Sequence, residues 1–397
     1  MKKTLLSILT ILTLTYTYGQ NYQSADSLVI KDLIIQIKSL QDINDNNTKT
    51  VKALLSGREY DAQTKYNIIK FNLINAVETF QLLSDKTTNL KSRNSTNSFD
   101  ILIKELNNPQ SEALGFNFNE TLLKLVNEHI QPKKKNVAKN ILEAVEGITQ
   151  SPIITSIPTF TPAISISNSV IGVLRSTSIF DDKVDNQKIK NFETALNNYI
   201  QYYSALSDAN QVFKFNLEHQ KEELGILQQN IYEQVIFFAR TLKFQVQPKG
   251  PNEDVGEYLN VLFKSFNKSY IENIFTELEK EHTEISQNTK KIKYDEILKN
   301  QYLKDANNRL EEFISLTTQF EFKYTEYFNI LEQYNTRIIK ALDIAKTNKI
   351  ATSGDVDNKK IEFENKKKES ISDIKTSINI DQLKNSKQKI NYTARII

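Results

Sequence analysis

The chain has 397 residues, of which 25% are charged and 10% aromatic, and its formal net charge is +3. Because it contains no cysteine, disulfides, thiol nucleophiles, thiolate metal sites and a lipidated cysteine after a leader are excluded. Nine glycines and seven prolines are too few for a loop-rich α/β enzyme of this length, so we expect an all-α fold of long helices.

The first residues have the pattern of a secretory signal peptide. Lys2 and Lys3 precede an apolar run over residues 5–14, and small and polar residues follow it. A permanent membrane span takes roughly 20 apolar residues, so this run is too short to remain as an anchor. We therefore expect residues 1–19 to be removed on export and the mature protein to be periplasmic or secreted. Removing the two lysines lowers the formal charge from +3 to +1, which gives no electrostatic basis for nucleic-acid binding.

Residues 20–146 are predicted to form the N-terminal helices of a bundle. Apolar stripes over residues 30–43 and 59–91 have the three- and four-residue spacing of amphipathic helices, and we expect these two helices to pair antiparallel. A third helical pattern, over residues 120–146, is interrupted at Pro132. Proline lacks a backbone donor and kinks or breaks a helix.

A basic run follows this proline directly. Lys133, Lys134 and Lys135 stand just before the most apolar part of the mature chain, where their ammonium groups can contact anionic lipid headgroups. Such runs are also common on solvated helix faces. Both interpretations stay open.

An uncharged segment comes next, in a chain where a quarter of the residues are charged. Residues 147–174 read GITQSPIITSIPTFTPAISISNSVIGVL. Because Pro152, Pro158 and Pro162 interrupt the segment, it cannot form one continuous transmembrane helix. We expect residues 147–181 to form a single apolar insert between long helices.

Two structures fit the insert. Isoleucine and valine alternate with serine after Pro162, which favours a short β-tongue turning near residues 159–162. The alternative is a half-helix over residues 163–179, as part of a helical hairpin. In both, the large apolar side chains are candidates for membrane insertion, and in both they can instead cap the bundle or fill its core. The candidates are Ile153, Ile154, Ile157, Phe160, Ile164, Ile166, Val170, Ile171, Val173 and Leu174.

Residues 182–350 are predicted to form a hairpin of two long helices. Apolar and aromatic residues alternate at spacings of four and three from Ile189 to Phe238, and again from Ala306 to Ala345. This is the period of a coiled-coil seam. Asn210, Gln220 and Gln234 occupy seam positions, where polar residues fix register and the number of partners.

The ends of this hairpin are set by polar stretches and turn residues. Pro248 and Gly250 allow the chain to reverse between the two seams, and the polar residues 286–293 are predicted to form a bend. The lysine-rich residues 351–397 are predicted to be a polar C-terminal helix or a tail.

No constellation of residues predicts catalysis. Glu279 and His282 form one Glu-x-x-His pair, the half-motif of di-iron bundles, but neither His129 nor His219 supplies a second copy. We interpret this pair as part of a surface ion pair. The chain has no glycine-rich phosphate loop, no zinc-binding His-Glu-x-x-His helix and no nucleophile elbow. We expect no cofactor, no metal and no enzymatic activity.

This layout resembles the α-helical pore-forming toxins of the cytolysin A and haemolysin BL type. The resemblance lies in the placement of residues 147–174 between a helix ending near Glu146 and another starting near Asp182. Those toxins are exported, elongated bundles that keep one apolar tongue or hairpin packed away until they meet a membrane. The resemblance implies a membrane-active protein, a pore-forming toxin or toxin component, whose partners are a lipid membrane and either further copies of itself or a partner helical protein.

Two other classes fit the pattern less specifically. The alternative function is an exported structural or interaction protein, such as a coiled-coil spacer or adhesin component, whose apolar segment is buried as a bundle cap. Tunnel-forming outer-membrane channels also combine long helices with strands, but they carry two copies of the strand-bearing insert, and this chain has one.

Overall fold

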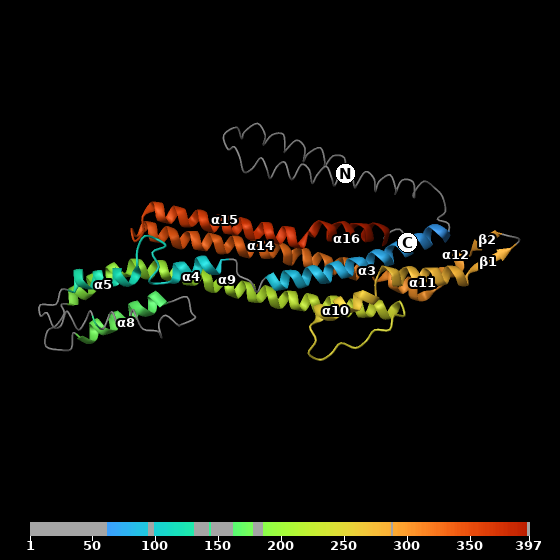
Figure 1. Cartoon of the computed structure of the whole chain (residues 1–397), viewed down its shortest axis with the longest axis horizontal. Helices are drawn as coiled ribbons and strands as arrows, with labels where there is room; N and C mark the ends of the chain where they lie inside the picture. The colour runs from blue at the N-terminus through green and yellow to red at the C-terminus, as the bar shows by residue number, and fades with distance from the viewer. Residues whose placement is uncertain are drawn as a thin grey trace, which may run out of the picture. The chain divides into compact units, whose positions relative to one another are not determined.

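The computed structural model describes residues 62–93, 99–130, 143, 162–177, 186–286 and 289–394. The chain divides into two units, residues 1–65 and 66–397, and the fold below is that of the second unit. Its described residues are almost entirely helical, with one small two-stranded sheet among them (Figure 1). The predicted all-α fold built from long antiparallel helices is therefore confirmed. The predicted signal peptide, the predicted helix over residues 30–43 and the basic run Lys133, Lys134 and Lys135 lie outside the described residues.

The described part of the chain contains helices of very different lengths and one pair of short strands. They are α3 (Ala62–Arg93), α4 (Asp100–Asn107), α5 (Phe118–His129), α8 (Pro162–Thr177), α9 (Asn186–Thr241), α10 (Val255–Ser265), α11 (Lys268–Glu281), β1 (Thr283–Ser286), β2 (Thr289–Ile292), α12 (Tyr294–Ile297), α13 (Gln301–Asn308), α14 (Leu310–Thr347), α15 (Ser353–Ile378) and α16 (Ile380–Ala394).

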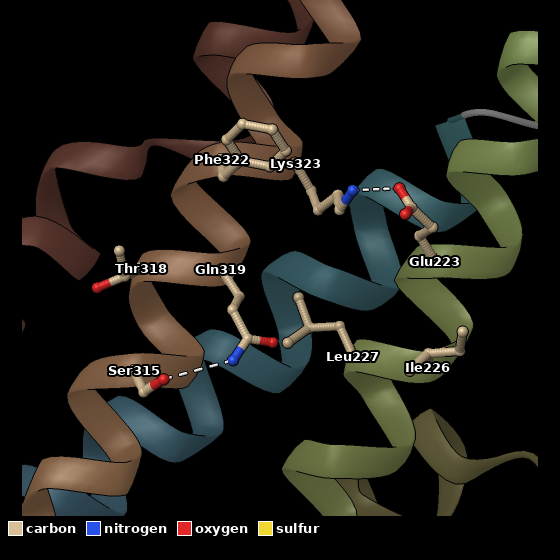
Figure 2. Close-up of a pocket in the computed structure, with 8 residues that line it drawn as sticks. All are labelled: Glu223, Ile226, Leu227, Ser315, Thr318, Gln319, Phe322 and Lys323. Carbon is tan, nitrogen blue, oxygen red and sulfur yellow. Dashed lines mark hydrogen bonds and ion pairs between the residues drawn. The ribbon is translucent and has the colours of Figure 1, made fainter.

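The longest helices, α9 with 56 residues and α14 with 38, pack against each other antiparallel. As the residue number rises along α9, the number of its partner on α14 falls. The side chains that interact are Gln201 with Asn348, Asp208 with Arg337, and Glu223 with Lys323 (Figure 2). These two helices carry the two predicted seams. The chain thus builds its own coiled-coil-like pair, as the matching periods predict.

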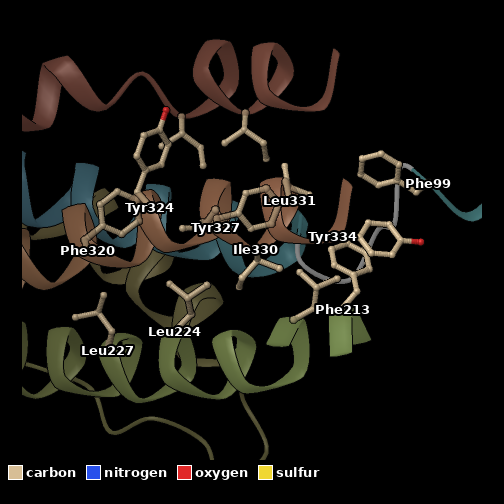
Figure 3. Close-up of a cluster of buried hydrophobic side chains, with 14 of the residues drawn as sticks. Phe99, Phe213, Leu224, Leu227, Phe320, Tyr324, Tyr327, Ile330, Leu331 and Tyr334 are labelled. Atoms are coloured by element: carbon tan, nitrogen blue, oxygen red, sulfur yellow. The ribbon is translucent and has the colours of Figure 1, made fainter. Parts of the chain in front are cut away.

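Large side chains from both helices fill the space between them (Figure 3). Phe213 of α9 stacks on Tyr334 of α14 with ring centroids 3.9 Å apart. Nearby, Leu224 and Leu227 are buried on the α9 side, and a row of aromatic and aliphatic residues is buried on the α14 side. Offset aromatic pairs add about 0.5–1.5 kcal/mol to the free energy gained by burying their area. This interface is the centre of the core.

Two of the predicted polar seam residues join the helices as expected. The Oδ1 atom of Asn210 accepts a hydrogen bond of 2.6 Å from the Tyr334 hydroxyl, and Nε2 of Gln220 donates one of 2.8 Å to the backbone carbonyl of Lys323. Gln234 departs from the prediction, because it is only half-buried while the adjacent Val235 is fully buried. A helix with 3.6 residues per turn drifts away from a strict seven-residue seam over this length.

Shorter helices pack on this pair. Phe80 of α3 contacts Phe238 of α9 and Phe313 of α14, with centroid distances of 5.6 and 4.3 Å, so α3 lies across both helices. Helices α5 and α8 pack on α9, and α15 and α16 pack on α14. The C-terminal region, predicted as a helix or a tail, is helical through residue 394.

The bend predicted at residues 286–293 is more structured than the sequence indicated. Strands β1 and β2 pair antiparallel there, with Thr283 opposite Ile292 and Ser286 opposite Thr289. β-Branched Thr and Ile residues recur in both strands, which favours extended backbone. The stretch before α14 is accordingly a series of short helices and a hairpin, rather than two long helices joined at a bend.

Glu279 links α11 to α3. Its carboxylate accepts a 3.1 Å hydrogen bond from the Lys70 ammonium and a short one from the Tyr66 hydroxyl. Burial raises the pKa of Glu279, but the hydrogen bonds from Tyr66 and Lys70 outweigh it, so the pKa lies below the ordinary value of 4.5. The carboxylate of the predicted Glu-x-x-His pair therefore forms an ion pair with Lys70.

We predict that replacing Glu279 with Gln lowers stability by about 1 kcal/mol at neutral pH, the scale of a part-exposed ion pair. A carboxylate with a depressed pKa in the folded state stabilises the fold fully above its unfolded pKa and loses that contribution as the pH falls through the folded value. The difference between parent and E279Q in urea unfolding should shrink below about pH 4.5. A difference that stays constant from pH 7 to pH 3 would contradict this assignment.

Candidate functional site

Helix α8 is the described part of the uncharged segment, residues 147–174. Pro162 stands at its first position, where the missing backbone N–H is unpaired in any helix. The helix has 16 residues, so it is roughly 24 Å long at 1.5 Å per residue. The β-tongue prediction is therefore wrong for residues 162–177, and the half-helix alternative is what the structure shows.

One face of α8 is buried against α9. Its fully buried residues are Ala163, Ile166, Val170 and Leu174, at spacings of three and four that align them along one side. Ser167 is also buried, and its hydroxyl donates a 2.7 Å hydrogen bond to the Ala163 carbonyl. This bond explains why the alternating serines do not prevent a helix: the inward-facing hydroxyl is satisfied within the helix itself.

The candidate insertion residues divide into three groups. Ile166, Val170 and Leu174 are fully buried. Ile164 and Ile171 are half-buried and packed against the core, and Val173 is half-buried. The remaining candidates, Ile153, Ile154, Ile157 and Phe160, lie outside the described residues, as do the candidate headgroup contacts Lys133, Lys134 and Lys135.

The outer face of α8 is small and polar, with Asn168, Ser169 and Gly172 exposed. At its C-terminal end, Arg175 donates hydrogen bonds of 3.1 Å from Nε and 2.8 Å from Nη2 to Oε1 of Glu193 on α9. This ion pair is largely exposed and contributes at most about 1 kcal/mol. Apolar burial therefore dominates the docking of α8: its three fully buried large side chains contribute about 5–9 kcal/mol, at 1.5–3 kcal/mol each.

A second feature, which the sequence interpretation missed, is a groove between α9 and α14 (Figure 2). It has a volume of about 400 Å³. Ile226 from α9 and Phe322 from α14 border it, with exposed fractions of 63% and 64%. The remaining lining residues are Glu223, Leu227, Ser315, Thr318, Gln319 and Lys323. The signal in the sequence was a pair of large apolar residues that belong to neither predicted seam.

The groove continues along the same two helices. A second hollow of about 330 Å³ shares Phe322 with the first and reaches Asn216 and His219 on α9. In the first hollow, Lys323 pairs with Glu223 across the groove, and it also pairs at 2.9 Å with Glu326, which lines the second hollow. Burial lowers the pKa of Lys323, but hydrogen bonds to Glu223 and Glu326 outweigh it, so its pKa is raised and it stays charged at neutral pH.

Metal-holding clusters and membrane-spanning helices are both absent from the described residues. These residues contain no group of three or more His, Cys, Asp or Glu side chains arranged to hold a metal ion. Within these same ranges, no helix is both long enough and apolar enough to cross a bilayer.

Comparison with known proteins found no family model, no curated protein and no solved structure that matches the chain.

We predict that Ile166→Ala loosens α8 specifically. Removing a fully buried isoleucine costs about 2–5 kcal/mol, and where a helix opens locally its amide exchange rates rise exponentially with the free energy lost. Hydrogen exchange in residues 162–177 should accelerate about 30-fold or more, since each 1.4 kcal/mol is a factor of ten. Ser169→Ala, on the exposed face, is the control and should leave exchange unchanged. Equal exchange rates in the two variants would contradict the packing of α8 on α9.

Proposed function

We propose that the protein is exported and acts on membranes by transferring its apolar segment, residues 147–174, from the helical bundle to a lipid bilayer. In this proposal it works as a pore-forming toxin or toxin component, as the layout shared with the cytolysin A and haemolysin BL type implies. It has no enzymatic activity, and several copies, or a partner helical protein, assemble on the membrane.

The observation that carries the proposal is the long uncharged run, residues 147–174, in a chain in which 25% of the residues are charged. The described half of this run belongs to a separate short helix. A helix that serves only a bundle can carry charged residues along its whole outer face. On α8, Asn168, Ser169 and Gly172 occupy that face, and its one charged residue, Arg175, lies in the last turn. Asn, Ser and Gly are far less costly than Lys, Arg, Asp or Glu when a helix moves into lipid.

The energetics of such a transfer are nearly balanced. Burial of the apolar face of α8 against α9 stabilises the docked helix by about 5–9 kcal/mol of free energy. A bilayer offers the same apolar side chains an equivalent environment, so a modest difference in affinity is enough to shift the helix from one to the other. Because α8 alone is shorter than the roughly 20 residues of a spanning helix, crossing the bilayer requires the rest of the segment or several copies.

A second function is favoured by one observation. Complete burial of Ile166, Val170 and Leu174 is also what a permanent structural role requires. In that alternative the protein is an exported spacer or adhesin component, and α8 closes one part of its bundle without ever leaving it.

The decisive experiment is dye release from anionic and neutral liposomes. We expect the parent chain to release dye, and a triple variant with Ile157, Phe160 and Ile164 changed to Asp to lose this activity, because three charges raise the cost of insertion by roughly 2.5–3.5 kcal/mol each. The matched control, S372D with T376D and S377D, adds three charges at exposed positions of α15, outside the segment. It should keep dye release, which separates the cost of inserting charges from a general effect of net charge.

The two functions predict different outcomes. If the parent chain binds to neither type of liposome and releases dye from neither, the structural function is favoured. If the triple Asp variant keeps full activity, the apolar segment is not the insertion element. Binding to anionic liposomes alone would implicate Lys133, Lys134 and Lys135, and their joint replacement with Gln should then remove the lipid preference.

A further inference from the structure

The outer face of α9 carries large apolar residues at a regular spacing. Phe215, Ile226 and Phe237 are eleven residues apart, with exposed fractions of 69%, 63% and 44%. Eleven residues are close to three full turns, so the three side chains lie on one face of the helix. They span roughly 33 Å. Each lies outside the seam that α9 shares with α14.

Gly225 lies beside the middle residue of this stripe. Glycine inside a helix costs about 1 kcal/mol relative to alanine, so it calls for a reason in the packing. The part of the chain that the structure describes offers none, because a Cβ atom added at Gly225 would meet no atom of a neighbouring element within 4 Å. A glycine at this point allows the backbone of another helix to come close to Ile226.

We infer that this face is the site where a second copy of the chain binds, with the two α9 helices antiparallel and a two-fold axis at Ile226. Ile226 is equidistant from the two phenylalanines. A two-fold axis there places Ile226 against the second copy's Ile226, and Phe215 of each copy against Phe237 of the other. The stripe is therefore complementary to itself, as an isologous interface requires.

The polar residues between the apolar ones fit the same symmetry. At equal distances from Ile226, Glu222 lies opposite Asn230, Glu223 opposite Gln229, and His219 opposite Glu233. Each pairing places a carboxylate against an amide or an imidazole that can donate a hydrogen bond. In a parallel pairing in register, each of these glutamates would instead face the same glutamate of the second copy. Like charges in contact are costly.

The groove widens this face beyond a single helix. Phe322 of α14 and Ile226 of α9 are both exposed and line the same groove, one from each helix (Figure 2). A second α9 lying along the groove contacts both helices, and by symmetry the contact occurs twice. The α9 and α14 helices of both copies then form a contact of four helices. Such contacts bury long, shallow apolar surfaces. This inference does not depend on membrane activity, because it concerns the chain in the absence of lipid.

Sedimentation equilibrium of the full chain in lipid-free buffer tests the association. We expect a dimer that dissociates on dilution, and Ile226→Glu should raise the dissociation constant about 30-fold or more, since it places two carboxylates at the axis of the interface. Ile361→Glu is the control, because Ile361 is equally exposed, at 59%, on α15. A monomer at every concentration, or equal weakening by both variants, would overturn the inference.

Cysteine crosslinking tests the geometry, and the chain has no native cysteine to interfere. Under mild oxidation, Ile226→Cys should form a disulfide-linked dimer by itself. Phe215→Cys should crosslink to Phe237→Cys in a mixture, but not to itself, because its two copies lie roughly 33 Å apart across the axis. Efficient self-crosslinking of Phe215→Cys would show a parallel pair and refute the two-fold axis. Unchanged thermal unfolding of each variant ensures that a negative result reports on association.

Discussion

The antiparallel seam between α9 and α14 is the interaction on which the described fold depends. It joins helices of 56 and 38 residues through a continuous row of buried side chains, and α5, α8, α10 and α13 pack on α9 while α15 and α16 pack on α14. Polar contacts such as Asn210 with Tyr334 hold the register that lets the aromatic rings interlock. The shorter helices are therefore additions to a pair that already has a complete interface of its own.

This arrangement is compatible with the proposed release of α8 from a rigid centre. Helix α8 is held mainly by its own apolar face on α9, so its removal leaves the seam intact. Its ion pair from Arg175 to Glu193 places it near the N-terminal end of α9. The stripe from Phe215 to Phe237 begins 22 residues further along, roughly 33 Å away. The proposed membrane insertion and the inferred self-association therefore involve different parts of the same long helix and do not compete for one surface.

The sequence predicted the seam well and the periphery less well. Apolar residues at alternating spacings of four and three residues, from Ile189 to Phe238, constrain the geometry strongly, because the apolar residues of each added heptad must fall on the same face of the helix. Short elements carry much less information. Alternating isoleucine and serine after Pro162 fits a strand as well as a helix, and only packing on α9 decides between them. The two four-residue strands near Thr283 and Thr289 were too short to be recognised.

The groove was missed for a different reason. A periodicity search assigns one apolar face to each helix, so Ile226 and Phe322 appeared as isolated exposed residues. Their significance depends on α9 and α14 bringing them to the same side, which is a property of three-dimensional packing. On α15, similarly, Ile361 is exposed while Phe363, two residues later, reaches the core and stacks on Phe99.

The central claim is that one apolar surface is shared between the bundle and a bilayer, and a single fluorescent reporter tests it most directly. The chain contains no tryptophan, so Ile164→Trp on the half-buried edge of α8 would be its only indole. With vesicles of brominated lipid added, the account predicts strong quenching of this tryptophan, because α8 leaves α9 and enters the acyl chains. An unquenched tryptophan on protein that is demonstrably bound to the vesicles would contradict it, and α8 would then be a permanent part of the bundle.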